Sequence, residues 1–274
     1  MGCCDSIITT ITTTHLLQMK NAGQKITMLT AYDYSMSGIL DTAGVDVLLV
    51  GDSLGMVMLG YKDTIPVTMD EMVHHTKAVV RACNHSLIVA DMPFLSYKID
   101  VRDAVRNAGR LIKEGGAAGV KVEGGAEIVD VVAALIKADI PVMGHIGLTP
   151  QAVHQMGGYK VQGKDSKTAQ KIFYDAQCLA DTGVFGLVIE CIPYKLAEEI
   201  THTLPNTPTI GIGAGPHCNG QVLVSHDLLG LYNKKTPKFV RKYADLTGII
   251  TTAVEKFSKD VREQKFPGLE ESYE

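Results

Sequence analysis

The sequence predicts an α/β protein of the (β/α)8 barrel class, with one extra helix before its first strand. Eight short apolar runs, rich in β-branched residues, alternate with stretches of helical periodicity. Such alternation is typical of a parallel sheet whose strands are buried on both faces. The chain has 274 residues, close to the roughly 250 that are typical of such a barrel. An open doubly wound sheet is the alternative, because periodicity alone does not show that a sheet closes.

The first half of the chain supplies four of the predicted strands, and each strand is followed by a predicted helix. A short helix over 15–22 ends at Gly23 and precedes the first strand. The clearest later helix is 103–114, whose apolar residues form one stripe that Gly115 and Gly116 terminate. The four predicted strands are 26–31, 45–50, 86–90 and 118–122, and the helices after them end near 43, 83, 114 and 138.

The second half continues the alternation. Its predicted strands are 140–144, 185–189, 209–212 and 221–225, and its predicted helices are 167–182 and 237–262. A long polar loop, 147–165, separates the fifth strand from the next helix. Its glycine-rich part, 157–164, is interpreted as a lid over an active site, and a solvated surface loop is the alternative. No linker-like change of composition divides the chain, so we predict one domain over 1–274, with 1–14 as a mobile tail.

The composition argues against a nucleic-acid-binding protein, a membrane-spanning protein and a disulfide-bonded protein. The net charge is −4 without a basic block, which argues against a nucleic-acid partner. No apolar run approaches the roughly 20 residues that a membrane span needs. The six cysteines contain no CxxC pair and indicate reduced thiols in a cytoplasmic protein. The start Met1-Gly2-Cys3-Cys4 matches a permissive lipidation pattern, which we interpret as a chance match.

Five polar side chains follow predicted strands two to six. They are Asp52, Asp91, Glu123, His145 and Glu190. In a barrel these strand ends converge on one mouth, where binding and catalysis take place. A single polar residue there often caps the next helix. Four carboxylates in this series are hard to explain by capping, because like charges brought together repel. A bound cation would relieve that repulsion.

Acidic oxygen ligands without a Cys/His cluster favour Mg²⁺ over Zn²⁺. Because Mg²⁺ usually takes only one or two protein carboxylates, some of Asp52, Asp91 and Glu123 would bind it through water. Lys121 shares a strand face with Glu123, and either bridges a neighbouring acid or holds a substrate carboxylate. Glu190 is then available as a base. This arrangement suits proton abstraction next to the carbonyl of a 2-oxo acid.

These residues stand in motifs that resemble the ketopantoate (3-methyl-2-oxobutanoate) hydroxymethyltransferase family. The resemblance extends from about residue 15 to the carboxyl end, with many specific motifs in one order. The motifs are Thr30-Ala31-Tyr32-Asp33-Tyr34-Ser35, Val50-Gly51-Asp52-Ser53-Leu54-Gly55-Met56, Ala90-Asp91-Met92-Pro93-Phe94, Val120-Lys121-Val122-Glu123-Gly124-Gly125, Gly144-His145-Ile146-Gly147-Leu148-Thr149-Pro150-Gln151, Gly157-Gly158-Tyr159-Lys160-Val161-Gln162-Gly163, Ile189-Glu190-Cys191-Ile192-Pro193, Ile210-Gly211-Ile212-Gly213-Ala214-Gly215 and Phe266-Pro267-Gly268.

The resemblance implies a barrel that transfers a hydroxymethyl group from 5,10-methylenetetrahydrofolate to 3-methyl-2-oxobutanoate, giving 2-dehydropantoate and tetrahydrofolate, the first step towards pantothenate and coenzyme A. It also implies one Mg²⁺ per subunit and a homodecamer. By residue, it implies that Asp52, Asp91 and Glu123 bind the metal and that Glu190 is the base. The oxo acid is then held by Asp52, Ser53, Asp91 and Lys121, and His145 lies near the reacting groups.

Two other functions stay open at this point. One is a Mg²⁺-dependent lyase or mutase of oxo acids, of the phosphoenolpyruvate-mutase and isocitrate-lyase type. Those enzymes use a reactive cysteine loop, which this chain lacks after its fourth strand. The other is a non-catalytic oligomeric scaffold, against which the intact acids, Lys121 and Glu190 argue. The glycines of 210–215 have GxGxG rather than GxGxxG spacing, so we interpret them as a tight turn and not a dinucleotide site.

Overall fold

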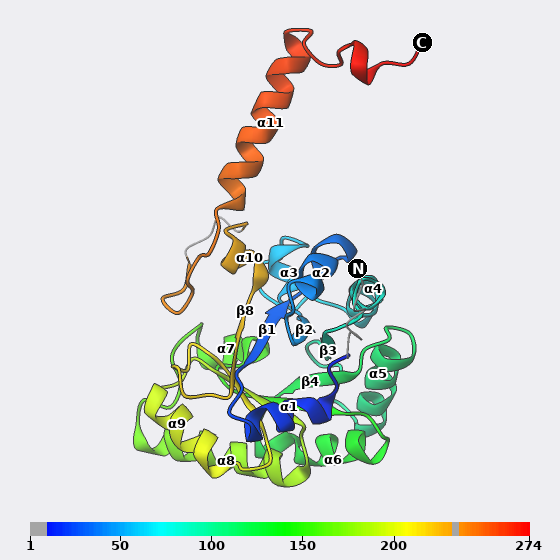
Figure 1. Cartoon of the computed structure of the whole chain (residues 1–274). Coiled ribbons are helices and arrows are strands. Elements are labelled where there is room, and N and C mark those ends of the chain that lie inside the picture. The colour runs from blue at the N-terminus through cyan, green and yellow to red at the C-terminus, as the bar shows by residue number, and fades with distance from the viewer. Residues whose placement is uncertain (1–9, 232–235) are drawn as a thin grey trace, which may run out of the picture. The chain divides into compact units, whose positions relative to one another are not determined.

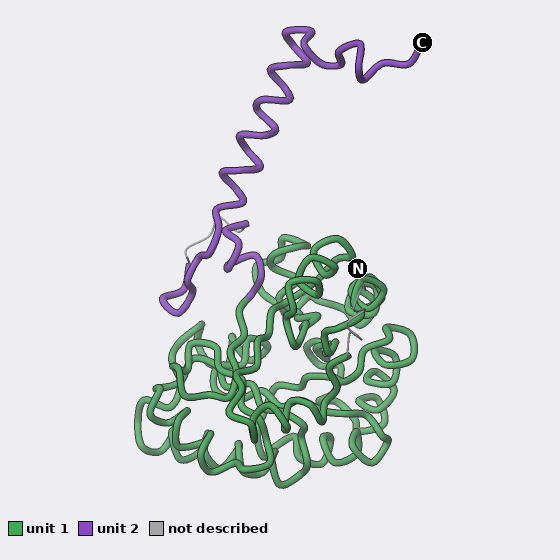
Figure 2. Tube along the Cα trace, in the orientation of Figure 1, with its two compact units in different colours: residues 1–223 green, residues 224–274 purple. Residues whose placement is uncertain are grey.

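The structure is a computed structural model that describes residues 10–231 and 236–274. These residues fall into two compact units, divided after Leu223 (Figure 2). The expectation of one domain over 1–274 stays a prediction. The Met1-Gly2-Cys3-Cys4 start lies outside the described residues.

The first unit contains a closed barrel of eight parallel strands in sequence order. The barrel is closed by β8, which pairs with β1 in parallel through Ile26 and Gly220, among others. This confirms the predicted barrel and excludes the open sheet. The strands are β1 Ile26–Thr30, β2 Val47–Val50, β3 Leu87–Asp91, β4 Gly119–Glu123, β5 Val142–Gly147, β6 Gly186–Glu190, β7 Thr209–Ile212 and β8 Gly220–Leu223.

Helices follow most of the strands and surround the barrel (Figure 1). The α-helices of this unit are α1 Thr13–Asn21, α2 Tyr34–Thr42, α3 Leu54–Val57, α4 Met69–Ala82, α5 Val101–Lys113, α6 Val129–Lys137, α7 Val153–Met156, α8 Ser166–Thr182 and α9 Tyr194–Thr203, and the 3-10 helices are η1 Ala126–Ile128 and η2 Pro150–Ala152. Helices α3, α7 and α9 were not predicted from the sequence. The last was recognisable, since Leu196, Ala197 and Ile200 form a buried stripe at helical spacing.

The predicted tail extended too far along the chain. Helix α1 begins at Thr13, and before it the Ile11 N–H donates to the His85 carbonyl at 2.7 Å. Residues 10–14 therefore make specific contacts, whereas residues 1–9 lie outside the described part of the chain. Leu16 of α1 is fully buried and joins the cluster that fills the barrel interior. The extra amino-terminal helix is thus present, and it packs against the barrel.

Alternation along each strand separates two apolar layers. Val47 and Leu49 of β2 belong to the interior cluster, whereas Leu48 and Val50 pack against the surrounding helices. The same parity holds in the other strands, because successive side chains of a strand point to opposite faces. The interior cluster is Leu16, Ile26, Met28, Val47, Leu49, Leu87, Val89, Met143, Val188, Ile210 and Val222. Continuing this parity to the carboxyl ends shows which polar residues face inward.

The second unit is helical. It contains α10 Ser225–Leu229, α11 Leu246–Arg262 and the 3-10 helix η3 Leu269–Glu271. The predicted start of the long helix at Pro237 was wrong, because Asp245 caps α11 by accepting a hydrogen bond from the Gly248 N–H at 3.3 Å. No residue of α11 is buried. In the described part of the chain, no helix is long and apolar enough to cross a membrane.

Candidate active site

The predicted site residues face the barrel interior just beyond the apolar layer. Asp91 has the parity of Leu87 and Val89, and both Lys121 and Glu123 lie opposite the helix-facing Val120 and Val122 of β4. The same alternation places His145 after Met143 and Glu190 after Val188 on inward-facing positions. Period-2 alternation therefore delivers charged groups from neighbouring strands to one end of the barrel.

Four of these side chains form one connected set around the Lys121 ammonium group. Its Nζ lies 3.0 Å from Asp91 Oδ1 and 3.2 Å from His145 Nδ1. The same imidazole nitrogen is 3.3 Å from Glu123 Oε1. On the other side of the ring, Nε2 lies 3.2 Å from Oε2 of Glu190. His145 thus connects the acid cluster to the carboxylate that the sequence analysis assigned as the base.

Asp52 joins the set from the loop after β2. Its backbone N–H donates to Asp91 Oδ2 at 3.0 Å, and its side chain is buried with those of Asp91 and Glu123. Ser53 lies at the edge of this cluster, where its hydroxyl is 2.8 Å from the Tyr32 hydroxyl. Gly51 leaves room for both, since a Cβ there would lie 2.7 Å from Ser53 Oγ and 3.5 Å from Asp91 Oδ2.

The site contains two residues that the sequence analysis did not select. Gln151, in η2 after β5, donates from Nε2 to Asp52 Oδ2 at 2.8 Å. Tyr97 lies with its hydroxyl 2.9 Å from Gln151 Oε1 and 3.0 Å from the backbone nitrogen of Glu123, from which it accepts a hydrogen bond. Both side chains are buried. Gln151 stands in the motif 144–151 of the family resemblance, which was the available signal.

Burial and crowding make protonation unequal among the acids. Burial raises the pKa of Asp52 well above its ordinary value, and the charges of Asp91 and Glu123 raise it further. The pKa of Asp91 is also raised, mainly by burial, although the Lys121 ammonium acts in the opposite direction. Burial alone would raise the pKa of Glu123 as well, but His145 and Lys121 outweigh it and lower that pKa. Three buried carboxyls therefore do not all ionise readily without added positive charge.

The two basic groups respond in the opposite sense. Burial would lower the pKa of Lys121, but the surrounding acids Asp91, Glu123 and Asp52 outweigh it and raise that pKa. Burial and the Lys121 charge would lower the pKa of His145, yet Glu123 and Glu190 outweigh both and raise it. Lys121 is therefore a permanent cation at neutral pH. An imidazolium at His145 is favoured by the carboxylates on its two sides.

A family model described as ketopantoate hydroxymethyltransferase matches residues 10–269 of this chain. The chain belongs to the ketopantoate hydroxymethyltransferase family. It is 58% identical to the 3-methyl-2-oxobutanoate hydroxymethyltransferase of Carboxydothermus hydrogenoformans, over 96% of this chain and 95% of that protein. It is 59% identical to the one from Moorella thermoacetica, over 96% of this chain and 97% of that protein. The family resemblance that the motifs indicated is thus confirmed.

The barrel is also similar to solved structures outside the ketopantoate hydroxymethyltransferase family. A 2,3-dimethylmalate lyase, described as a member of the phosphoenolpyruvate mutase and isocitrate lyase superfamily, superimposes with a TM-score of 0.60. The alignment covers 97% of this chain and 92% of that one, at 15% sequence identity. At this identity the likeness shows a shared fold alone.

The acid cluster contains oxygen donors of the kind that bind a divalent cation. Among the described residues, no three His, Cys, Asp or Glu side chains are placed to hold a metal ion together. However, the buried Asp91 Oδ1 makes no aligned hydrogen bond, although Lys121 Nζ lies 3.0 Å away. Burial and the neighbouring acids raise the pKa of Asp52, so added positive charge would favour its ionised form. Oxygen donors of this kind suit a hard cation that keeps several waters. The donor chemistry fits Mg²⁺, and the assignment of the three ligands stays a prediction.

The loop interpreted as a lid contacts α3 and the residue that follows Glu190. The Tyr159 hydroxyl lies 3.9 Å from Met56 Sδ of α3. The Gln162 N–H donates to the Cys191 carbonyl at 2.9 Å. Cys191 directly follows Glu190 and has a φ of 48°, in the left-handed region that non-glycine residues rarely adopt. The loop is therefore attached beside the predicted base, and its closure over the site stays a prediction.

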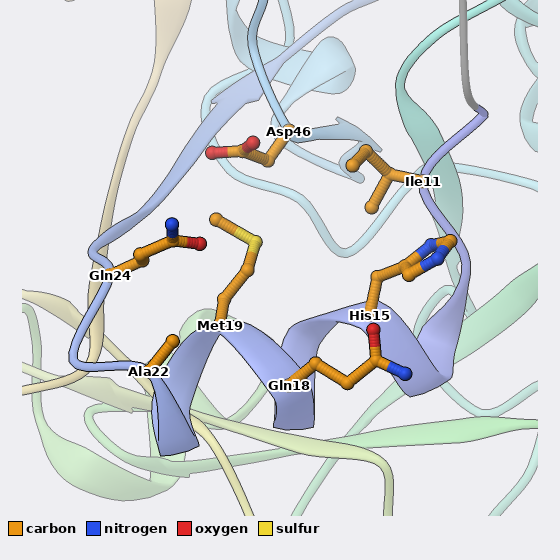
Figure 3. A pocket seen from close by; sticks show the side chains of 7 residues that line it. All are labelled: Ile11, His15, Gln18, Met19, Ala22, Gln24 and Asp46. Atoms are coloured by element: carbon orange, nitrogen blue, oxygen red, sulfur yellow. The ribbon is translucent and has the colours of Figure 1, made fainter.

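A cavity elsewhere in the barrel unit is a poor candidate for the active site. It measures about 370 Å³ and lies beside α1 (Figure 3). Its lining residues are Ile11, His15, Gln18, Met19, Ala22, Gln24 and Asp46. Gln24 and Asp46 precede the first two strands, so this cavity opens at the amino-terminal end of the barrel. Barrel enzymes place their chemistry at the opposite end.

Proposed function

We propose that this protein is an enzyme, a 3-methyl-2-oxobutanoate hydroxymethyltransferase. It transfers a one-carbon unit from 5,10-methylenetetrahydrofolate to 3-methyl-2-oxobutanoate and, with the elements of water, forms 2-dehydropantoate and tetrahydrofolate. The observation that carries the proposal is the arrangement around His145, which has the acid cluster and Lys121 on one side and Glu190 on the other. The family membership then supports this particular oxo acid as the substrate.

Glu190 removes the proton from C3 of the oxo acid. Its side chain is 14% exposed, whereas that of His145 is 3% exposed, so the Glu190 carboxylate is the group that substrate can reach. An imidazolium at His145, whose Nε2 lies 3.2 Å from Oε2, would attract this carboxylate and limit its orientation. General-base catalysis of this kind accelerates a reaction by about 10²–10⁴.

Lys121 attracts the carboxylate of the oxo acid, with Asp52, Ser53 and Asp91 around it. The raised pKa of Lys121 keeps its positive charge at neutral pH. The 3.0 Å contact with Asp91 limits the rotamers of this long side chain. Substrate is thereby bound in one orientation, with C3 directed to Glu190.

Asp52, Asp91 and Glu123 would hold one Mg²⁺ per subunit, some of them through water. When bound, this ion supplies positive charge beside the developing enolate. It would also favour the ionised form of Asp52. Two further properties are proposed with the function. A homodecameric assembly is implied by the family resemblance, and a cytoplasmic location is indicated by the scattered cysteines without a CxxC pair.

The competing functions differ in their first chemical step. A lyase or mutase of oxo acids would break or rearrange a bond of the oxo acid without the folate. A scaffold would do neither. The described cysteines are Cys83, Cys178, Cys191 and Cys218, and none lies in the segment after β4 where the lyases carry their reactive loop.

The decisive experiment follows exchange of the C3 hydrogen of 3-methyl-2-oxobutanoate with solvent deuterium by NMR. It is run with and without Mg²⁺, before and after addition of methylenetetrahydrofolate. Mg²⁺-dependent exchange followed by formation of 2-dehydropantoate is the expected result. Cleavage or rearrangement of the oxo acid without the folate would favour the lyase, and no reaction under any condition would favour the scaffold.

A further inference from the structure

Gln151 uses its whole side-chain amide within the acid cluster. The residue is 4% exposed. Its Nε2 donates to Asp52 Oδ2 at 2.8 Å and to the Met92 carbonyl at 2.9 Å. Its Oε1 lies 2.9 Å from the Tyr97 hydroxyl, which accounts for the acceptor end of the amide. A buried amide whose two N–H groups both donate and whose oxygen faces a hydroxyl is held in one orientation.

The backbone of the same residue contacts a second acid. The Gln151 N–H donates to Glu123 Oε2 at 3.0 Å. Gln151, in η2 after β5, therefore connects two carboxylates. One is that of Asp52, which follows β2, and the other is that of Glu123, at the end of β4. Each acid has one oxygen bonded to Gln151, and the second oxygen of Glu123 faces His145 at 3.3 Å.

The Tyr97 hydroxyl contacts both Glu123 and Gln151. It accepts the Glu123 N–H at 3.0 Å and lies 2.9 Å from both the Glu123 carbonyl and Gln151 Oε1. The phenol is fully buried, and burial raises its pKa well above the ordinary value. It therefore stays a neutral donor. The end of β4 and the Gln151 amide are thus held by one hydroxyl group.

We infer that Gln151 is a positioning residue that holds Asp52 and Glu123 in fixed rotamers, from which they bind a divalent cation directly or through water, with Tyr97 as its support. This inference rests on the proposed function for the presence of the cation. The physical reason is the mutual repulsion of the acids: without a donor between them, buried carboxylates turn apart or take up protons. Residues that orient metal ligands in this way typically contribute about 10–100-fold to metal affinity or activity.

If Gln151 served only the stability of the fold, its substitution would lower the Tm and leave the affinity for metal unchanged. Direct metal titration separates this structural role from the positioning role. Gln151→Leu removes the amide and keeps the backbone N–H to Glu123. We expect the Kd for Mn²⁺, measured by electron paramagnetic resonance in the absence of substrates, to rise about 10–100-fold. The matched control is Thr76→Val, which removes a buried hydroxyl that donates to the Met72 carbonyl at 2.6 Å within α4. It should lower the Tm and leave the Kd for Mn²⁺ unchanged.

Tyr97→Phe provides a milder second variant, should Gln151→Leu fail to fold. Loss of this one hydroxyl group, with Gln151 left in place, predicts a rise of about 2–10-fold in the same Kd. The inference is overturned if the variants lower the Tm while the Kd stays at the wild-type value, or if the wild type does not bind Mn²⁺. Failure of the proposed function gives a different result: a wild type that binds Mn²⁺ but forms no 2-dehydropantoate.

Discussion

Lys121 Nζ lies 3.0 Å from Asp91 Oδ1, and the two side chains are only 5% and 3% exposed. The ammonium is the central positive charge among three buried acids, Asp52, Asp91 and Glu123, and their combined effect raises its pKa. A buried charge whose partner is removed is strongly destabilising, because the remaining group has lost its water without compensation. Lys121 and Asp91 therefore contribute to the stability of the barrel as well as to the proposed binding of the substrate.

Lys121→Met is expected to lower the free energy of unfolding by about 3–5 kcal/mol in metal-free buffer, as measured by urea denaturation. The double variant Lys121→Met with Asp91→Asn should lose less than the sum of the two single variants, since neither charge is then left alone. Additive losses would show that the 3.0 Å contact contributes nothing to stability.

Glu190→Gln is expected to slow hydroxymethyl transfer by about 10²–10⁴, because the amide cannot accept the C3 proton. Exchange of that proton with deuterium should stop, while Mn²⁺ binding and the Tm stay near wild-type values. Glu198→Gln is a suitable control, since Glu198 pairs with His217 at 3.4 Å and takes no part in the acid cluster. Wild-type exchange in the Glu190 variant would remove its assignment as the base.

The barrel and most of its site were predictable because both depend on short-range periodicity. Period-2 alternation was enough to place Lys121 and Glu123 on one face of β4. Strand order in a barrel then brought Asp91, His145 and Glu190 to the same end. These are consequences of strand geometry, which acts between residues two apart, and they need no knowledge of loop conformation.

Gln151 escaped prediction because its role depends on a loop. Its amide reaches Asp52 across 99 residues of sequence, and only the conformation of η2 directs it there. The start of α11 escaped for a local reason, since the apolar pattern before it does not reveal that Asp245 caps the helix at Gly248. The direction of the Gln151 amide and the first residue of α11 each depend on single hydrogen bonds, which hydrophobic periodicity does not predict.

Asp41 should make the barrel sensitive to acid. Its carboxylate accepts hydrogen bonds from the backbone N–H groups of Asn84, His85 and Ser86, the shortest at 2.7 Å. Burial would raise the pKa of Asp41, but these hydrogen bonds outweigh it and lower that pKa. The unfolded state then binds more protons, so the stabilisation is complete above the unfolded pKa of about 3.9 and is lost as pH falls through the folded value.

Asp41→Asn is therefore expected to lower the free energy of unfolding by about 1.5–3 kcal/mol at pH 7, the usual contribution of hydrogen bonds to a charged group. The loss should begin to shrink near pH 4, where the wild-type carboxylate is protonated in the unfolded state, and should go on shrinking as pH falls to the lowered folded pKa. Urea denaturation at several pH values measures both effects. A difference between variant and wild type that does not change with pH would contradict the lowered pKa.

Gly51→Ala tests how tightly the mouth of the barrel is packed. The added Cβ would lie 2.7 Å from Ser53 Oγ, a distance at which the serine side chain must move. Since the Ser53 hydroxyl is 2.8 Å from that of Tyr32, its movement would break this contact and displace a group proposed to hold the oxo acid. We expect a higher KM for 3-methyl-2-oxobutanoate with little loss of stability.

Gly109→Ala in α5 is the matched control, because its added Cβ meets nothing within 4 Å. The control should leave KM unchanged and stabilise the helix by about 0.5–1 kcal/mol, and an equal KM in both variants would separate Ser53 from substrate binding.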